Sequence, residues 1–343
     1  MKSYVLKSPG EIEIIEKEIL PLKKNEVLIR VSNIGICGSD IQLFEGTYKG
    51  PVRYPLLFGH EWSGTVTEIG ENVKKVKPGD KVTGDCSHFC GNCDQCSIDK
   101  NLCKNIDKFG ITIDGASSEY IIREENYIYK APQELELELI CLTEPIAVAA
   151  HLIGKVINSL PVIKNKRILI YGGGPIGISA LLILTKLYSC QKVYLTDIIN
   201  NRSRIAKKLG ASIINPENLY YKFDNLDYSS IYNNSTFDFI VESTGNPEVF
   251  KNTLNLIRPL GVIGCLGMMN EVTIIQKLIV IKGLKLIGSI GGTGEFPMVL
   301  DFIKENQNDV KNLISHKIPI REINKAFTIA KDISQAMKVQ LIF

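Results

Sequence analysis

The 343-residue chain is predicted to be an α/β protein with a β-rich domain and a doubly wound parallel sheet. First, its length suits two domains at roughly 100–200 residues each. Second, short apolar runs between Gly and Pro turns fill the first 145 residues. Third, strand and helix patterns alternate after residue 145. The composition, 45% hydrophobic and 22% charged, supports buried cores and excludes intrinsic disorder.

The N-terminal part contains several short candidate strands. The turn at Pro21–Asn25 precedes one of them, and the turn at Lys77–Asp80 precedes another. Short strands joined by such turns are typical of a barrel or sandwich-like domain. The candidate strands are Glu11–Glu18, Val27–Val31, Trp62–Ile69 and Lys81–Thr83.

The second part alternates strands with helices, which predicts parallel pairing and a doubly wound sheet. The predicted strands are Arg167–Tyr171, Lys192–Asp197, Phe237–Val241, Gly261–Leu266 and Leu284–Ser289. The predicted helices are Pro175–Tyr188, Arg202–Leu209 and Pro247–Ile257. Residues 215–236 are rich in Asn, Tyr and Ser and are expected to form a polar surface excursion. The tail, from about residue 290, should hold one or two helices and a final strand, Val339–Phe343.

The chain shows no clear sign of export or of a membrane span. Ile168–Thr185 is uncharged and reaches the lower length limit for a span, but Gly172–Pro175 breaks it into a strand, a turn and a helix. Charged residues interrupt the N-terminus, which excludes a signal-peptide pattern. Nine cysteines, an odd number, do not suit a disulfide framework. We therefore expect a cytoplasmic protein. A net charge of +3 gives no reason to expect nucleic acid as a partner.

A glycine-rich motif follows the strand Arg167–Tyr171. Gly172, Gly174 and Gly177 occupy the three glycine positions of Gly-x-Gly-x-x-Gly, with Pro175 and Ile176 between the last two. The next strand ends in Asp197, twenty residues after Gly177. This context predicts dinucleotide binding, with the pyrophosphate at the helix N-terminus. Asp197 would accept hydrogen bonds from the ribose and repel a 2′-phosphate, which favours NAD over NADP. Arg202 could weaken that preference.

Four cysteines lie within fourteen residues: Cys90, Cys93, Cys96 and Cys103. Such spacing is typical of a tetrahedral, four-thiolate zinc site, which has no open position and is therefore structural. Reduced surface thiols and a [4Fe–4S] cluster are the alternatives. Cys86 and His88 could serve as ligands if the register differs.

A second set of metal-binding residue types is scattered along the chain. Cys37, the pair His60-Glu61, and Glu144 together would suit zinc with a position left open for substrate. Spacing alone does not unite them. Taken singly, each has an ordinary structural explanation as a small buried residue, a core histidine or a solvated charge.

The order of motifs resembles the zinc-dependent medium-chain alcohol and polyol dehydrogenases from end to end, with sorbitol and threonine dehydrogenases as the nearest subgroup. The matching motifs are Gly-Ile-Cys-Gly-Ser-Asp (35–40), Gly-His-Glu-x-x-Gly (59–64), the four cysteines (90–103), Glu-Pro-x-x-Val-Ala-x-His (144–151), Gly-Gly-Gly-Pro-Ile-Gly (172–177) and Lys-Leu-Gly-Ala (208–211). In that subgroup a glutamate replaces a second cysteine ligand, and Glu144 stands at its position.

The resemblance implies a GroES-like catalytic domain, 1–146 and 290–343, and a Rossmann coenzyme domain, 147–289. It implies a catalytic zinc at Cys37, His60 and either Glu61 or Glu144, and it places Ser39 between the substrate oxygen and a proton relay. The implied reaction is reversible oxidation of a secondary alcohol, such as a polyol, sugar alcohol or cyclitol, by NAD. A homodimer or homotetramer is also expected by resemblance.

Two positions depart from the family pattern. Gln42 stands where the relay histidine is usual, and it cannot titrate near neutral pH. The loop from Cys96 to Cys103 is one residue shorter than expected, which bears on whether that lobe holds zinc. Three other hypotheses remain: a zinc-free NADPH quinone or enone reductase on the same fold, a non-catalytic nucleotide-binding redox sensor, and a zinc-ribbon nucleic-acid binder.

Overall fold

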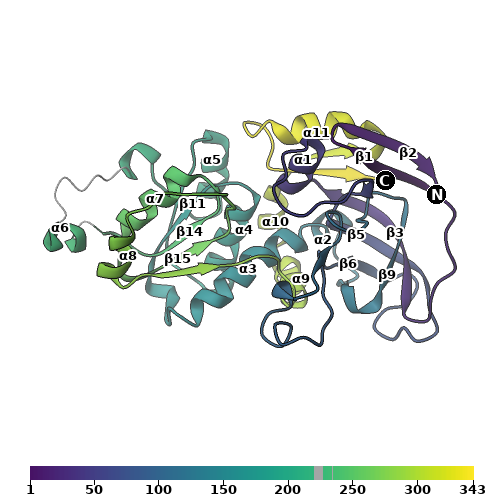
Figure 1. Ribbon diagram of the computed structural model, residues 1–343, viewed down its shortest axis with the longest axis horizontal. Coiled ribbons are helices and arrows are strands. Elements are labelled where there is room, and N and C mark those ends of the chain that lie inside the picture. Colours follow the sequence, from purple (N-terminus) through teal and green to yellow (C-terminus); the bar gives the residue numbers. More distant parts are fainter. Residues whose placement is uncertain (220–226, 234) are drawn as a thin grey trace. The chain divides into compact units, whose positions relative to one another are not determined.

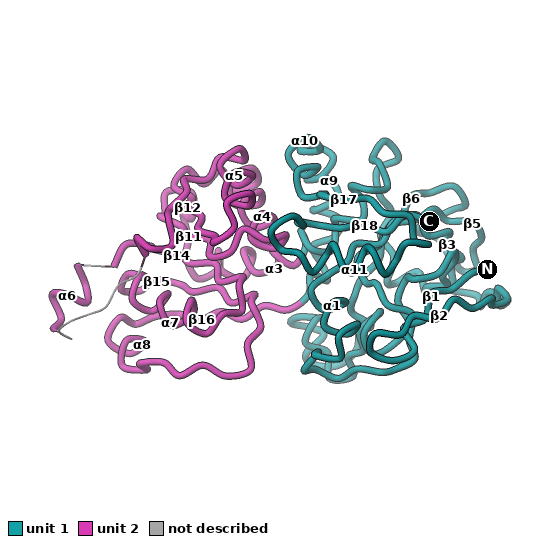
Figure 2. The backbone as a smooth tube through the Cα atoms, turned by 90° about the horizontal axis from the view of Figure 1, so that it is seen from above, with its two compact units in different colours: residues 1–147, 291–343 teal, residues 148–290 magenta. Residues whose placement is uncertain are grey.

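The computed structural model describes residues 1–219, 227–233 and 235–343 (Figure 1). The chain divides into two compact units (Figure 2). Unit 1 comprises Met1–Ala147 and Gly291–Phe343, and unit 2 comprises Val148–Ile290. We expect residues 147–289 to form the coenzyme domain, and residues 1–146 with 290–343 to form the catalytic domain. These functional roles and boundaries stay predictions.

The main sheet of unit 1 combines strands from the first part of the chain with the last two strands of the sequence. Its strand order is β10-β6-β5-β3-β18-β17, with β9 also paired to β3. The last strand, β18, therefore lies inside the sheet, antiparallel to β3 and parallel to β17. The bounds are β3 Glu26–Gly35, β5 Glu61–Ile69, β6 Lys81–Gly84, β9 Tyr120–Glu124, β10 Ile128–Lys130, β17 Ile314–Pro319 and β18 Lys338–Ile342.

Two small sheets and several helices complete unit 1. The sheet β2-β1-β4 consists of Glu11–Glu16, Lys2–Ser8 and Leu56–Leu57, and the pair β7-β8 of Ser87–His88 and Asp107–Lys108. The hydrophobic core of unit 1 contains the buried residues of β3 and β5, including Trp62, packed with Phe58 and Phe327. The helices are α1 Gly38–Glu45, α2 Leu137–Ile140, α3 Thr143–Ile157, which runs on into unit 2, α9 Phe296–Glu305, α10 Gln307–Val310 and α11 Ile323–Lys331.

Unit 2 contains a six-stranded parallel sheet in the order β13-β12-β11-β14-β15-β16. The chain moves outward from β11 to β13 and then crosses to β14 on the other side of β11, so the strand order reverses there. This order confirms the predicted doubly wound Rossmann sheet. The strands are β11 Arg167–Tyr171, β12 Lys192–Thr196, β13 Ser212–Ile213, β14 Phe237–Glu242, β15 Ile257–Cys265 and β16 Lys285–Gly288.

Helices of unit 2 pack on the parallel sheet, which explains why its inner strands are apolar on both faces (Figure 1). In β11, Ile168, Leu169 and Ile170 are all fully buried. The helices are α4 Pro175–Leu182, α5 Asn200–Lys208, α6 Tyr228–Asn233, α7 Pro247–Leu256 and α8 Gln276–Lys282.

Several predicted elements differ from the structure. The helix predicted to reach Tyr188 is α-helical only to Leu182 and continues as a π-helical turn, Ile183–Leu187. There the Thr185 hydroxyl donates to the carbonyl of Leu181 at 2.7 Å, a contact that competes with regular backbone pairing. The tail holds three helices, α9, α10 and α11, and the additional strand β17, rather than one or two helices and one strand.

The polar excursion predicted for residues 215–236 is only partly described. Residues 220–226 and 234 lie outside the described residues. Its flanks contain a 3₁₀ turn, Pro216–Leu219, and helix α6, so the described part is more regular than the sequence predicted.

One helical stretch, Leu137–Ile157, is long and apolar enough to cross a membrane, with a mean hydropathy of 1.6. In its most apolar 18-residue window, 78% of the residues are buried, and Leu152, Ile153 and Val156 are fully buried, as expected of a core helix. The other uncharged run, Ile168–Thr185, is divided between β11 and α4.

Candidate functional site

Cys37 lies at the N-terminus of α1, immediately after β3. Its backbone is extended, with φ −92° and ψ 161°, so helical geometry starts only at Gly38. The Asp40 carboxylate accepts a hydrogen bond from the Cys37 N–H at 2.8 Å, which caps the helix. This contact fixes the backbone that carries the Cys37 thiol.

His60 and Glu61 lie where β5 begins. Gly59 precedes them with φ +86°, a conformation that glycine adopts without strain. The Gly59 N–H donates to Asp40 Oδ1 at 3.3 Å, and His60 Nδ1 lies 3.7 Å from the same oxygen. Asp40 therefore connects the Cys37 turn with the His60 turn.

Glu61 is held by a lysine from the far end of the chain. Lys338 Nζ donates to Glu61 Oε1 at 2.6 Å and to the Ile36 carbonyl at 3.3 Å. Both side chains are almost fully buried, with exposed fractions of 3% and 1%. A Cβ atom on Gly35 would lie 2.2 Å from Glu61 Oε2, so only glycine leaves room for the carboxylate at this position.

Cys37, His60 and Glu61 each offer a ligand atom, and these atoms lie within 4.8 Å of one another. His60 Nδ1 and Glu61 Oε2 are buried without a hydrogen-bond partner, which is costly unless another group binds them. Burial opposes protonation of His60, but the Asp40 carboxylate and the nearby thiols Cys86 and Cys37 hold its pKa well above the ordinary value. Surroundings that favour a positive charge on His60 also favour a bound cation. The donor set of thiolate, imidazole and carboxylate fits zinc.

Glu144, the alternative acid, lies at the start of α3 and is buried, but outside the group within 4.8 Å. Burial, with the charge of Glu61, raises its pKa to about 7. The Ser39 hydroxyl is half-buried and has no hydrogen-bond partner within the described ranges. The Gln42 side chain is exposed.

The four cysteines of the 90–103 segment converge. Their sulfurs lie within 4.8 Å of one another, with Cys103 Sγ 3.5 Å from Cys90 Sγ. Backbone N–H groups of Cys90 and Asn105 point at the Cys103 sulfur at 3.3 Å each, which lowers the pKa of that thiol. All nine cysteines of the chain lie in the described part, and none forms a disulfide. A ready set of four sulfurs with donor N–H groups around it fits zinc despite the shortened loop.

The glycine-rich turn joins β11 to α4. Gly172 has φ +94°, and a Cβ on Gly177 would lie 1.8 Å from the Gly172 carbonyl oxygen, so both positions need glycine. Gly174 caps α4 and Pro175 occupies its first turn, with Ile176 next to it. The first N–H groups of a helix have no acceptor within it, so this turn can cradle a phosphate.

Asp197 directly follows β12 and reaches the same turn. Its Oδ2 accepts a hydrogen bond from Gly173 N at 2.6 Å, and its Oδ1 accepts one from Ile199 N at 2.6 Å. Arg202 Nη1, from α5, lies 3.9 Å from Asp197 Oδ2. The carboxylate predicted to meet the ribose is therefore fixed beside the glycine turn, with a cation next to it.

The sequence did not predict that Lys338 pairs with Glu61 or that Asp40 connects the Cys37 and His60 turns. Asp40 is three residues after Cys37, a spacing that signals a helix cap and could have been recognised. Lys338 has no local signal, because its partner Glu61 is 277 residues away in the chain.

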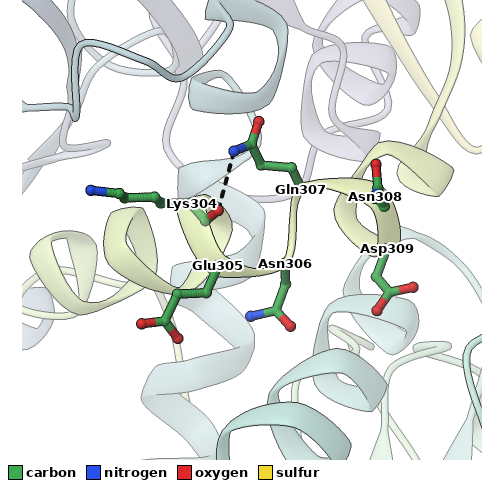
Figure 3. Close-up of a pocket in the computed structure, with 6 residues that line it drawn as sticks. All are labelled: Lys304, Glu305, Asn306, Gln307, Asn308 and Asp309. Carbon is green, nitrogen blue, oxygen red and sulfur yellow. Dashed lines mark hydrogen bonds between the residues drawn. The ribbon is translucent and has the colours of Figure 1, made fainter.

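A hollow of about 420 Å³ lies elsewhere, at the junction of α9 and α10 (Figure 3). It is lined by Lys304, Glu305, Asn306, Gln307, Asn308 and Asp309, consecutive polar residues of one turn. Gln307 Nε2 donates to the Lys304 carbonyl across it at 3.2 Å. It contains none of the metal-donor or dinucleotide residues and is not a candidate active site.

Unit 1 carries a thiolate-imidazole-carboxylate donor set, and unit 2 carries a dinucleotide-type glycine turn. Together they indicate an oxidoreductase that uses a metal ion and a nucleotide coenzyme. Comparison with known proteins gives the family. Residues 23–133 match the alcohol dehydrogenase GroES-like domain, and residues 175–305 match the zinc-binding dehydrogenase domain. The chain belongs to the zinc-type medium-chain alcohol dehydrogenase family, which confirms the resemblance, the fold class and the class of enzyme.

Relatives cover the chain almost completely. D-arabitol-phosphate dehydrogenase of Enterococcus avium is 31% identical over 95% of this chain and 93% of its own length. A short chain alcohol dehydrogenase of Escherichia coli, complexed with NADH, is 30% identical over 100% of this chain and 99% of that chain, with a TM-score of 0.88. A putative zinc-binding dehydrogenase of Sinorhizobium meliloti, bound to NADP, is 26% identical over 100% and 99%, with a TM-score of 0.86.

Proposed function

We propose that this protein oxidises a secondary alcohol of a polyol, sugar alcohol or cyclitol reversibly to the ketone, with zinc and NAD. The observation that carries the proposal is the convergence of Cys37, His60 and Glu61, with two buried ligand atoms that have no partner. Three protein ligands leave a fourth position for a substrate oxygen.

Cys37, His60 and Glu61 would hold the zinc, and Asp40 and Lys338 fix the positions of these ligands. Bound zinc supplies Lewis acidity, which lowers the pKa of an alcohol. Ser39, at the start of α1 two residues from Cys37, would accept the hydroxyl proton. Its hydroxyl is available because it has no other partner among the described residues.

The proton needs an exit that does not use Gln42, because an amide does not titrate near neutral pH. Glu144 is the acid suited to this task, since its pKa of about 7 lets it both accept and release a proton near neutrality. We therefore infer that Glu144 receives the proton through water rather than serving as a third permanent ligand.

NAD would bind at the glycine turn, with the pyrophosphate at the N-terminus of α4. The Asp197 carboxylate lies beside this turn, and its negative charge would repel the 2′-phosphate of NADP.

We expect Asp197→Ala to lower the ratio of NAD to NADP affinity by about tenfold or more. An unchanged ratio would count against the ribose role, and Arg202→Ala tests whether the adjacent cation moderates the preference.

The test of the function couples metal analysis to turnover. Zinc per chain is quantified, and nicotinamide reduction is followed with polyols, cyclitols, threonine, butanediol and simple alcohols. We expect two zinc ions per chain and turnover of one substrate class. Absence of zinc, with NADPH-dependent reduction of a quinone or enone instead, would refute the proposal.

Cys37→Ser removes the thiolate and should lower turnover by orders of magnitude while dinucleotide binding persists. Cys190→Ser is the matched control, because Cys190 is a buried thiol of unit 2 whose Sγ lies 3.8 Å from the Ile163 carbonyl. Equal turnover in wild type and Cys37→Ser would refute the assignment of Cys37 as a ligand of the catalytic zinc.

The finer statements about partners and location belong to the same proposal. We infer a homodimer or homotetramer in the cytoplasm, with a small-molecule alcohol as substrate and neither nucleic acid nor membrane as a partner. The odd number of cysteines and the grouping of four of them as a metal-donor set agree with a reducing compartment.

A further inference from the structure

Lys108 is bound differently from the two most buried lysines of the chain. Lys282 donates to three backbone carbonyls, and Lys338 donates to Glu61 and to a carbonyl. Lys108 is half-buried, and its Nζ donates to the Ser87 hydroxyl at 2.6 Å. Within the described ranges, no carboxylate oxygen lies within 4.0 Å of this ammonium group, and no second acceptor binds it. Two of its three N–H donors are therefore available for a ligand.

The backbone places Lys108 next to the metal-donor group. β8 pairs with β7 so that Lys108 lies opposite Ser87, and the Phe109 N–H donates to the Cys86 carbonyl at 2.9 Å. Gly110 packs on Gly59, because a Cβ at Gly110 would lie 3.0 Å from the Gly59 nitrogen. Gly59 directly precedes His60. The segment directly after Lys108 therefore lies against the turn that carries the histidine.

Electrostatic contacts agree with this placement. Burial raises the pKa of Cys86 to about 11, and the charges of both His60 and Lys108 act on this thiol in the opposite direction. Cys86 is thus within electrostatic range of the metal-donor histidine and of the lysine. Glu144, near the same histidine, is also within range of Lys108.

The acids near Lys108 do not neutralise it. Asp85 is occupied by other donors: the Thr293 hydroxyl at 2.7 Å, the Tyr129 hydroxyl at 3.0 Å and the Ser87 N–H at 3.0 Å. Within the described ranges, no oxygen of Glu144 lies within 4.0 Å of the Lys108 ammonium group. The Ser87 hydroxyl in turn donates to Asn101 Oδ1 at 3.3 Å, which orients its lone pairs for Lys108.

We propose that Lys108 binds an anionic group of the substrate, a phosphate ester or a carboxylate, and so selects an anion-bearing polyol over an uncharged one. This inference rests on the proposed dehydrogenase function and narrows its substrate class. Because Ser87 already holds the ammonium group, the Lys108 side chain loses little conformational entropy when it binds an anion. Its two remaining N–H donors can then form charge-assisted hydrogen bonds, which are strong.

The test compares three substrates with the zinc-loaded enzyme: an unsubstituted hexitol, its monophosphate ester and the corresponding aldonate. For Lys108→Met we expect kcat/KM to fall by about tenfold or more on the preferred anionic substrate, mainly through KM, and by less than about twofold on the hexitol. The substrate with the larger loss distinguishes phosphate from carboxylate. Lys108→Arg should restore most of the activity. Lys104→Met is the matched control, because Lys104 carries the same charge on the same lobe but is exposed and paired with Asp94 at 2.6 Å.

An equal loss on all three substrates would overturn the proposal, as would a wild-type preference for the uncharged hexitol. A second readout does not need turnover. Inorganic phosphate is titrated calorimetrically into zinc-loaded wild type, Lys108→Met and Lys104→Met. Binding that is lost only in Lys108→Met supports the site, and equal binding in all three refutes it. If the wild type oxidises no alcohol at all, the proposed function fails, while the phosphate titration still decides whether Lys108 binds an anion.

Discussion

The buried ion pair between Lys338 and Glu61 makes a prediction that can be worked out from its geometry. The two atoms lie 2.6 Å apart, and both side chains are at least 97% buried, since their exposed fractions are 3% and 1%. Lys338→Met keeps the volume but leaves the buried Glu61 carboxylate without its lysine counter-charge. Removing one partner of such a pair costs about 3–5 kcal/mol. We therefore expect the free energy of unfolding of unit 1 to fall by about that amount.

The assay is urea unfolding of the metal-free protein, followed by tryptophan fluorescence. Trp62 is the only tryptophan of the chain, it is 1% exposed, and it is adjacent to Glu61 in β5. Its emission therefore reports unfolding of unit 1 separately from that of unit 2.

Two further variants show whether the loss comes from the unpaired charge. Glu61→Gln combined with Lys338→Met replaces both charges and should be less destabilised than the sum of the single variants. Lys317→Met breaks an exposed pair with Glu138, 2.5 Å apart, and should cost about 0–1 kcal/mol. A Lys338→Met loss as small as that of Lys317→Met would refute the reasoning.

Four other predictions concern different parts of the chain. Gly177→Ala should weaken NAD binding by about tenfold or more, measured by fluorescence titration, because its Cβ would meet the Gly172 oxygen. Gly154→Ala, with no atom within 4 Å of its Cβ, should instead stabilise α3 by about 1 kcal/mol in thermal unfolding. Cys103→Ser should remove one zinc ion per chain and leave the other, and loss of both ions or of neither would contradict two independent sites. Burial lowers the pKa of Lys282 from 10.5 to about 8, so the unfolded state binds more protons between these values. Stability should therefore rise with pH across that window in wild type but not in Lys282→Met.

Features that depend on neighbouring residues could be predicted from the sequence. β11 begins and ends where the apolar run Arg167–Tyr171 predicted, and the glycine turn follows it directly. The four cysteines were united by spacing alone, because Cys-x-x-Cys brings two sulfurs close in any compact turn. These signals are local, so no knowledge of the rest of the fold was needed.

Features that depend on distant residues could not be predicted. The sequence left Glu61 and Glu144 as equal candidates, and only the fold shows that Glu61 joins Cys37 and His60. The strand β17 and the π-helical end of α4 were also missed, because tertiary packing and the Thr185 hydroxyl decide them rather than the apolar pattern.

The position of β18 has a consequence for synthesis of the protein. Lys338 is made 277 residues after Glu61, which corresponds to about 14–55 s of translation at roughly 5–20 residues per second. Throughout that time, nascent unit 1 lacks an interior strand of its sheet and the counter-charge of Glu61. Unit 2 has all its strands earlier, so it can fold while unit 1 is still incomplete. Metal acquisition at the candidate site is therefore expected to follow synthesis of β18, and deletion of Lys338–Ile342 should leave unit 1 without an interior strand and Glu61 without its counter-charge.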